Sequence, residues 1–187
     1  QNGRVAHPTT RRAHQKPRQN AAMPVTISTQ HQGCADPGVT RAMFSDSRFY
    51  KVLSELTPGS HTVSFDVSSG GDRVEWTQTI VLPDSVPASL RSMIGPSMTL
   101  VETQLWGGTD GEHRAAVRIA PVGLPAHCDA TYIIRPPAID GRCLVAVSAT
   151  LAVTVPIVGA KVEAIISEHF QSAVSARSRA AQMWQNG

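Results

Sequence analysis

The apolar pattern of the last quarter of the chain, from Leu144 to Trp184, predicts a long strand followed by a long helix. Every second residue from 145 to 155 is apolar, which is the period of a strand buried on one face. After Pro156 the spacing changes to threes and fours, as on one face of a helix, through Val158, Val162, Ile165, Ile166, Phe170, Ala173, Val174, Ala181 and Trp184. A helix of roughly 25 residues is nearly 40 Å long. Only a sheet built from the upstream strands is broad enough to support it.

The upstream sequence alternates in the same way and predicts several further strands. They are expected near residues 25–30, 63–67, 74–82, 98–106, 113–119 and 128–134, with Val63, Phe65 and Val67 on one inward face. Asp36 and Asp46 have the character of N-caps and predict two short helices after the first strand. We therefore expect an α+β fold in which a curved antiparallel sheet of about seven strands wraps around the long C-terminal helix.

Charge separates the chain into a tail and a domain. Residues 1–22 hold five Arg and Lys residues and no acid, so the remainder of this +3 chain is mildly acidic. The tail has too few apolar residues to form a core, so we expect a disordered basic tail at 1–22 and one domain at 23–187. A basic arm for nucleic acid or anionic lipid is the less favoured interpretation of the tail. The domain itself gives no reason to expect nucleic-acid binding.

Other features of the sequence indicate a cytoplasmic protein without stable membrane insertion. The three cysteines, Cys34, Cys128 and Cys143, are odd in number and lack CxxC spacing, which favours packed thiols in a reducing compartment. The first 30 residues contain no apolar run typical of a signal peptide. The uncharged stretch from Leu144 to Ala160 alternates with period two and contains Pro156, which argues against a membrane-spanning helix.

Three motifs resemble those of a known family. They are Phe44-Ser-Asp-Ser-Arg-Phe-Tyr50, Thr103-Gln-Leu-Trp-Gly107 and, most specifically, Val153-Thr-Val-Pro-Ile-Val-Gly-Ala-Lys-Val-Glu163. With the order of elements, they resemble a bacterial family of uncharacterised proteins in the START-like (polyketide cyclase and lipid-transport, SRPBCC) helix-grip superfamily, over Met23 to Trp184. The resemblance implies an apolar cavity between the sheet and the long helix. It implies no established activity and no catalytic residues.

A search for catalytic or metal-binding motifs leads to no assignment. The sequence contains no GxSxG elbow, no phosphate-binding glycine loop between a strand and a helix, and no HxH or HExxH spacing. We expect no catalytic residue, no metal and no cofactor. His169 lies near the apolar face of the long helix, where it is either a packed histidine or an acid, base or hydrogen-bond donor in a cavity.

Polar residues on otherwise apolar strand faces are the more informative signal. Gln78, Glu102, Gln104 and Tyr132 share faces with large apolar residues. Burying such groups without partners costs roughly 1 to 3 kcal/mol each. They are therefore paired internally, placed at a strand end, facing a wet pocket, or assigned to the wrong face by one residue. The candidate ligand-binding residues are Trp76, Gln78, Leu100, Glu102, Val117, Tyr132, Val147, Val162, Ile166, His169, Phe170 and Ala173.

Three functional hypotheses follow. The first is a binding or carrier protein for a lipid-like or polycyclic hydrophobic small molecule, with Pro83 to Ile94 as a mobile cover. The second is an enzyme of the cyclase or dehydratase kind, in which Glu102, Tyr132 or His169 performs acid–base chemistry. The third is a structural or interaction module whose core is filled by its own side chains (Trp76, Trp106 and Phe170). The sequence leaves enzymatic activity open.

Overall fold

The computed structural model describes residues 25–82, 84, 86, 88–108, 112–137, 141–153 and 159–186, without the side chains at 89, 90, 93 and 159–171. The tail predicted at residues 1–22 lies outside these ranges. The elements in order are β1 (Val25–Gln32), α1 (Pro37–Met43), α2 (Ser47–Leu56), β2 (Ser60–Val67), β3 (Arg73–Val81), α3 (Ala88–Ile94), β4 (Ser97–Gly107), β5 (His113–Pro121), β6 (Ala126–Arg135), β7 (Leu144–Val153) and α4 (Gly159–Asn186).

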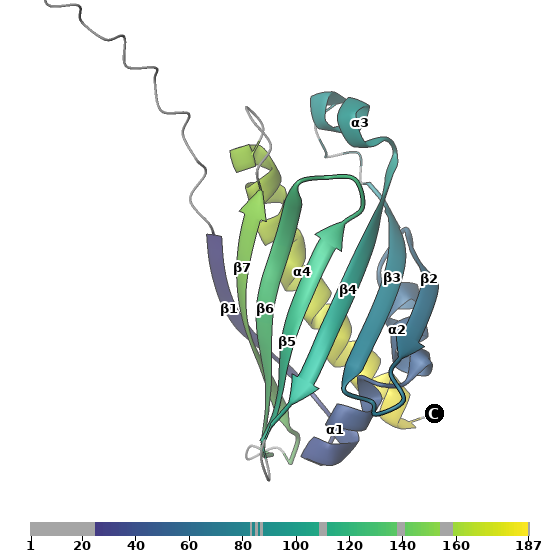
Figure 1. Cartoon of the computed structure of the whole chain (residues 1–187), viewed down its shortest axis with the longest axis vertical. Helices are drawn as coiled ribbons and strands as arrows, with labels where there is room; N and C mark the ends of the chain where they lie inside the picture. Colours follow the sequence, from purple (N-terminus) through teal and green to yellow (C-terminus); the bar gives the residue numbers. More distant parts are fainter. Residues whose placement is uncertain are drawn as a thin grey trace, which may run out of the picture.

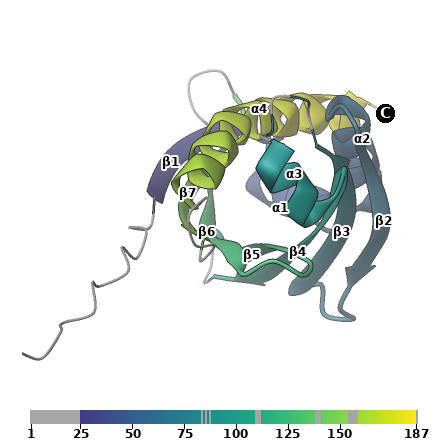
Figure 2. The same cartoon turned by 90° about the horizontal axis from the view of Figure 1, so that it is seen from above.

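The seven strands form one antiparallel sheet in the order β1-β7-β6-β5-β4-β3-β2 (Figure 1). Seen along the strands, the sheet curves around the space beneath α4, which runs across its open side (Figure 2). Helix α4 packs against α1, α2, β1 and β7. The predicted α+β helix-grip architecture is confirmed, including the two short helices after the first strand.

Both short helices begin where the sequence predicts them. The Asp36 carboxylate accepts a hydrogen bond from the Val39 amide at 2.9 Å, and the Asp46 carboxylate accepts one from the Arg48 amide at 2.8 Å. Each aspartate satisfies an amide that the first helical turn leaves without a partner. The caps fix where the chain turns from strand to helix and bring Phe44 and Tyr50 under the sheet, where both are fully buried.

The inward face of the sheet follows the predicted alternation on β3 to β7. On β7, for example, every second residue from Val145 to Val153 is buried. The strand register aligns these inward residues in rows across the sheet. One such row runs through Phe65, Trp76, Glu102, Ile119, Cys128 and Leu151. Glu102 is the only charged residue in that row, so the row itself offers it no oppositely charged partner.

The prediction for Val63 is wrong because β2 contains a bulge. The register of β2 against β3 shifts between Thr62 and Ser64, which leaves Val63 without a directly paired residue. The extra residue reverses the alternation, so Val63 is 58% exposed while Phe65 faces inward next to Trp76. A bulge of this kind has no signal in the apolar pattern of the strand.

Within the described ranges, no helix is both long and apolar enough to cross a membrane.

Candidate functional site

The inward face of strands β3 to β6 is fully buried at one end and only partly buried at the other. We call these the α1 end and the α3 end, after the helices that lie there in Figure 1. Toward the α1 end, inward residues such as Val74, Gln104, Ala115 and Ile134 are buried. Toward the α3 end, the inward residues are half-buried, namely Gln78, Ile80, Met98, Leu100, Ile119 and Cys128. The change occurs at the row of Glu102.

Helix α4 shows the same change at the same level. Val174, Arg177, Ala180 and Ala181 form its buried face. Ala173 precedes Arg177 by four residues and therefore lies on the same side of the helix, one turn closer to the α3 end. Nevertheless, Ala173 is exposed. Solvent thus reaches the inward side of β3 to β6 and the helix at Ala173, just beyond Glu102 and Arg177, whereas Leu151 and Val153 of β7 stay buried at this end.

Glu102 and Arg177 form a buried ion pair that joins β4 to α4. Arg177 Nη2 donates to Glu102 Oε2 at 2.5 Å, and the two residues are 2% and 8% exposed. Burial lowers the pKa of Arg177, but the negative charge of Glu102, together with Tyr132, Tyr50 and the hydrogen bond to Glu102, more than offsets this, so the pKa lies above its usual value. Each of the two groups depends on the other, because removing one would leave an unpaired charge in the core.

Gln104 continues this polar layer toward the α1 end. Its amide nitrogen donates to Glu102 Oε1 at 2.7 Å and to the Tyr50 hydroxyl at 2.9 Å, while its oxygen accepts from Trp106 Nε1 at 2.8 Å. The Tyr50 hydroxyl in turn donates to the Phe44 carbonyl at 3.0 Å. Burial, with the charge of Glu102, holds the pKa of Tyr50 well above its usual value. The side chains of Gln104, Tyr50 and Trp106 therefore all have partners, as a stable buried network requires.

His31 and Tyr132 complete the buried layer. The His31 ring lies 6.2 Å from the Phe44 ring, which lies 5.9 Å from Tyr132, and Arg177 Cζ lies 5.7 Å from the Tyr132 ring. Burial, together with the charge of Arg177, lowers the pKa of His31 to about 4. Burial also raises the pKa of Tyr132. His31 is therefore a neutral imidazole, and Tyr132 a neutral phenol, at physiological pH.

The structure brings several of the candidate ligand-binding residues together. Gln78 pairs with Leu100 across β3 and β4, and Trp76 with Glu102. Val117, Tyr132 and Val147 are buried, toward the α1 end, and Gln78 Oε1 accepts a hydrogen bond from Ser60 at 2.8 Å. The predictions for Val162, Ile166, His169 and Phe170 concern side chains outside the described part. Whether these residues bind a ligand stays a prediction.

The structure shows where the residues of the other two functional hypotheses lie, namely the acid–base enzyme and the module with a filled core. Glu102 and Tyr132 both lie next to Arg177, but the two carboxylate oxygens of Glu102 already accept hydrogen bonds. Trp76 and Trp106 are 2% and 8% exposed and belong to the aromatic core of the α1 end. The α1 end is thus filled by the protein itself, whereas the third residue of that hypothesis, Phe170, lies outside the described side chains.

Among the described residues, neither the cysteines nor the side chains that commonly bind metals form a further site for a ligand or a metal. All three thiols are free, and burial raises the pKa of Cys128 to about 11, so this thiol is protonated and unreactive. Among the described residues, no group of three or more His, Cys, Asp or Glu side chains could hold a metal ion.

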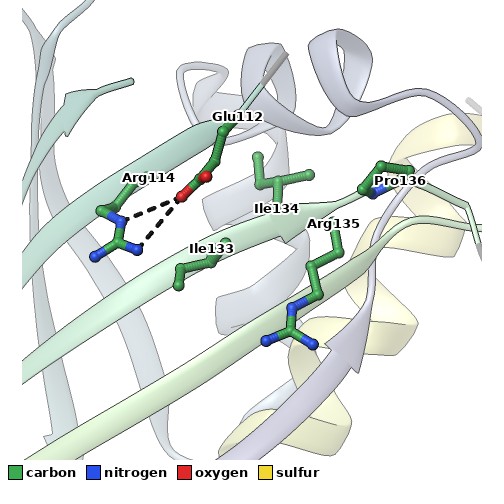
Figure 3. A pocket seen from close by; sticks show the side chains of 6 residues that line it. All are labelled: Glu112, Arg114, Ile133, Ile134, Arg135 and Pro136. Atoms are coloured by element: carbon green, nitrogen blue, oxygen red, sulfur yellow. Dashed lines mark hydrogen bonds and ion pairs between the residues drawn. The ribbon is translucent and has the colours of Figure 1, made fainter. Parts of the chain in front are cut away.

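Two pockets lie on the surface, away from the buried layer. One has a volume of about 390 Å³ at the α1 end of β5 and β6, where Arg114 pairs with Glu112 and Arg135 points outward (Figure 3). The other has a volume of about 530 Å³ and is lined by residues around α3, among them Asp84, Val86 and Pro96. Neither pocket contains a predicted ligand-binding residue. The second pocket lies at the α3 end, where solvent reaches the inward face.

Sequence reasoning missed three residues of the buried layer. Arg177 stands three residues after Val174 and four before Ala181, so its position on the apolar stripe of the helix could have revealed it. His31 continues the alternation of Val25, Ile27 and Thr29 beyond the predicted end of the first strand. Tyr50 gave no such signal, because its burial depends on how α2 packs against the sheet.

Comparison with solved structures identifies the fold. A Thermus thermophilus protein, TTHA0849, has a TM-score of 0.56 at 14% identity, covering 85% of this chain and 95% of its own. A START superfamily protein from Mycobacterium smegmatis has a TM-score of 0.55 at 12% identity, covering 85% and 98%. Norcoclaurine synthase from Thalictrum flavum, in complex with dopamine and hydroxybenzaldehyde, has a TM-score of 0.50 at 16% identity, covering 95% and 98%. The predicted START-like helix-grip fold is thereby confirmed.

Comparison of the sequence with known proteins and families identifies the family of the chain. No curated protein matches the chain. One family matches residues 24–184, nearly the whole of the chain, and its description is "Protein of unknown function (DUF2505)". The chain belongs to this family, which has a START-like helix-grip fold.

Proposed function

We propose that this protein binds and carries a lipid-like or polycyclic apolar small molecule at the α3 end, between the sheet and the first half of α4. One observation carries the proposal: burial falls at the same level on both walls. The inward residues of β3 to β6 are half-buried beyond Glu102, and Ala173 is exposed one turn beyond Arg177. Two facing surfaces that are both reached by solvent leave room for a third component.

The composition of these walls suits an apolar ligand. Ile80, Met98, Leu100 and Ile119 face inward and are only half-buried, so each still has apolar surface to lose from water. Burial of such surface contributes about 25 cal/mol per Å². Ligand sites typically combine apolar walls with a few well-placed polar groups. Here the layer of Glu102 and Arg177 would form the polar floor.

Helix α3 is in position to cover the site. In Figure 2, which views the molecule from this end, α3 lies between α4 and the strands. Arg91 of α3 pairs with Asp84 at 3.0 Å, and Arg91 Nη2 donates to the Val86 carbonyl at 3.4 Å. These short-range contacts hold α3 to its own preceding segment. We propose that α3 moves with this segment as the cover predicted from the sequence.

The fold supports this proposal by analogy. The structure of norcoclaurine synthase holds two small aromatic molecules, dopamine and hydroxybenzaldehyde. Fold analogy alone is a weak warrant for function, so the two solvent-reached walls remain the main support. A carrier is preferred over an enzyme because both Glu102 oxygens are engaged by donors of the protein.

The first experiment is native mass spectrometry of the protein purified from its own host, followed by organic extraction of bound molecules. A discrete additional mass is expected, and it should disappear in Leu100→Trp, which fills the α3 end. Leu105→Trp is the matched control, because Leu105 lies on the same strand but is 52% exposed on the outer face.

Two results would contradict the proposal. One is a protein that carries no additional mass and binds neither naphthol nor decanol. The other is an additional mass that Leu105→Trp removes and Leu100→Trp does not, since that would place the ligand on the outer face of the sheet.

A further inference from the structure

Cys34 and Cys143 are distant in the chain but face one another where β1 and β7 end. The regular pairing of the two strands stops at Gln32 and Leu144. Beyond it, the Gly33 amide donates to the Cys143 carbonyl and the Cys143 amide donates to the Cys34 carbonyl, each at 2.8 Å. Cys143 thus faces both Gly33 and Cys34, which is the two-against-one pattern of a β-bulge. The two cysteines are therefore direct neighbours across the strands.

The bulge turns the Cys34 side chain into the protein. The inward residues of β1 are odd-numbered, so Cys34 would face outward if the alternation continued, yet it is as fully buried as Cys143. Both thiols lie next to the Thr40 side chain of α1, which forms a hydrogen bond with each. A Cβ atom at Gly33 would lie only 2.6 Å from Thr40 Cγ2, so the glycine leaves room for this threonine. The two thiols therefore share one small space between the strand ends and α1.

The backbone spacing of the two cysteines suits a disulfide. Residues that exchange backbone hydrogen bonds across antiparallel strands have Cα atoms about 5.5 Å apart, and disulfides join Cα atoms about 4.4 to 6.8 Å apart. Cys34 Sγ here donates to Met43 Sδ at 3.9 Å. Turning Cys34 toward Cys143 breaks only this contact, which is a weak hydrogen bond.

The third cysteine lies too far away to compete. Cys128 of β6 pairs with Leu151, which stands near the other end of β7 from Cys143. The eight residues between Cys143 and Leu151 correspond to about 26 Å along an extended strand. Of the three free thiols, only Cys34 and Cys143 can therefore join within one folded chain.

The surroundings of the pair determine how it reacts. Burial raises the pKa of both thiols, while the hydrogen bond with Thr40 lowers it by a smaller amount. Both thiols are therefore protonated at physiological pH and react slowly in the folded protein. The neighbouring residues Asp36 and Gly141 are exposed, so the pair lies close beneath the surface. Folding, or local opening of this strand end, brings an oxidant to the thiols.

We propose that Cys34 and Cys143 are a redox pair, which a small disulfide such as oxidised glutathione converts into a disulfide bond between β1 and β7. One cysteine thiolate attacks a sulfur of the oxidant, forms a mixed disulfide and releases one glutathione thiol. The other cysteine then attacks the cysteine sulfur of the mixed disulfide and releases the second. The two cysteines lose two protons and two electrons, and these convert one glutathione disulfide into two thiols.

The bond would stabilise the α1 end without touching the proposed ligand site. It closes a loop of roughly 100 residues and so restricts the unfolded chain strongly. It also ties the start of α1 to β7, whereas the α3 end contains neither cysteine. We expect the oxidised protein to melt about 5 to 15 °C above the reduced protein. Its affinity for a ligand at the α3 end should be unchanged.

The test is refolding of the full chain in glutathione buffers that range from fully reduced to mostly oxidised. After acid quenching, free thiols are alkylated under denaturing conditions, and the protein is digested for peptide mass spectrometry. As the oxidised fraction rises, two of the three cysteines should escape alkylation, and one linked peptide should contain Cys34 and Cys143. The melting temperature of the oxidised protein is then compared with that of the same sample after reduction.

Serine variants identify the two partners independently. Cys34→Ser and Cys143→Ser should each abolish the intramolecular disulfide. Cys128→Ser is the matched control, and it should leave both the bond and the rise in melting temperature intact. If a variant does not fold, the linked peptide of the unaltered protein still decides, because it identifies both cysteines directly.

Three results would overturn the inference. One is alkylation of all three cysteines at every glutathione ratio. Another is a linked peptide that contains Cys128. The third is an oxidised protein that melts no higher than the reduced one, because the bond would then strain the fold. None of these results bears on the proposed ligand, since the pair lies outside the α3 end.

Discussion

The α1 end and the α3 end are two halves of one sheet, built on the same alternation but filled differently. At the α1 end the rings of Phe44, Phe49 and Tyr50 pack against Trp76 and Trp106 with centroid distances of 4.9 to 5.5 Å. At the α3 end the inward residues of β3 to β6 remain half-buried. The same strands thus provide a solid core and a surface that is still available for binding.

The difference comes from the two short helices after β1. Phe44 follows α1, while Phe49 and Tyr50 lie in α2, and all three are fully buried under the sheet. These residues fill the α1 end together with the buried strand residues, among them Trp76 and Trp106. A short insertion between two strands can therefore decide which half of a helix-grip fold becomes core and which is left for a ligand.

The largest expected effect contrasts core residues of the two ends. Phe44→Ala should lower the free energy of unfolding by about 3 to 5 kcal/mol, because it creates a cavity among packed rings. Leu100→Ala at the α3 end should cost less than about 2 kcal/mol, because Leu100 is half-buried and solvent can fill the space. Urea denaturation measures both. Equal losses would mean that the two ends are packed alike.

The next effect is a pH dependence that belongs to the α1 end. His31 has a lowered pKa of about 4 in the folded protein against 6.5 when unfolded, so the unfolded state binds the proton first. Stability is therefore complete above pH 6.5 and is lost as the pH falls toward 4, by up to about 3 kcal/mol. Urea denaturation across this range should show the loss in the unaltered protein and a smaller one in His31→Phe. A pH profile that His31→Phe leaves unchanged would contradict this assignment.

A smaller effect compares polar residues of the two ends. Tyr50→Phe removes the hydroxyl between Gln104 and Phe44, and it should cost about 1 to 3 kcal/mol, since no water can replace it in the core. Gln78→Leu at the α3 end should change stability by less than about 0.5 kcal/mol, since water can replace its bond to Ser60. A loss in Gln78→Leu as large as that in Tyr50→Phe would show that the α3 end is closed to water.

The smallest expected effect on stability concerns two aspartates that lie near the surface, one at each end. Asp46 caps α2 and accepts a hydrogen bond from Trp184 of α4 at 2.9 Å, so Asp46→Ala should cost about 1 kcal/mol. Asp84→Ala removes an exposed ion pair with Arg91, and the change in melting temperature should be close to zero. A clear destabilisation by Asp84→Ala would show that the cover is held more firmly than its contacts indicate.

The sequence alone was enough to predict which faces of β3 to β7 point inward. Glu102 and Gln104 share the apolar face of β4 in the sequence pattern, and both are buried there with partners. Those partners could not be predicted, because Arg177 lies 75 residues away on α4 and Tyr50 lies 54 residues from Gln104. The alternation of apolar and polar residues predicts which side chains of a strand face inward. The pairing of two buried groups depends instead on how separate elements pack.

Local irregularities of the strands were the second reason why part of the structure could not be predicted from the sequence. Val63 continues the apolar alternation of β2, yet the bulge reverses its direction. His31 looked like part of a loop because the predicted strand ended at residue 30, whereas β1 extends to Gln32. The error at Val63 came from a single residue of register, which suffices to exchange the two faces of a strand. The error at His31 came from the length of the strand.

The bulge in β2 also affects how the molecule meets other chains. β2 is an outer strand of the sheet, and the free amides and carbonyls along such a strand can accept a strand from another molecule. The bulge at Val63 interrupts their regular spacing in the middle of the strand. The bulge therefore makes this edge, with its exposed valine, a poorer template for edge-to-edge pairing with a strand of another chain.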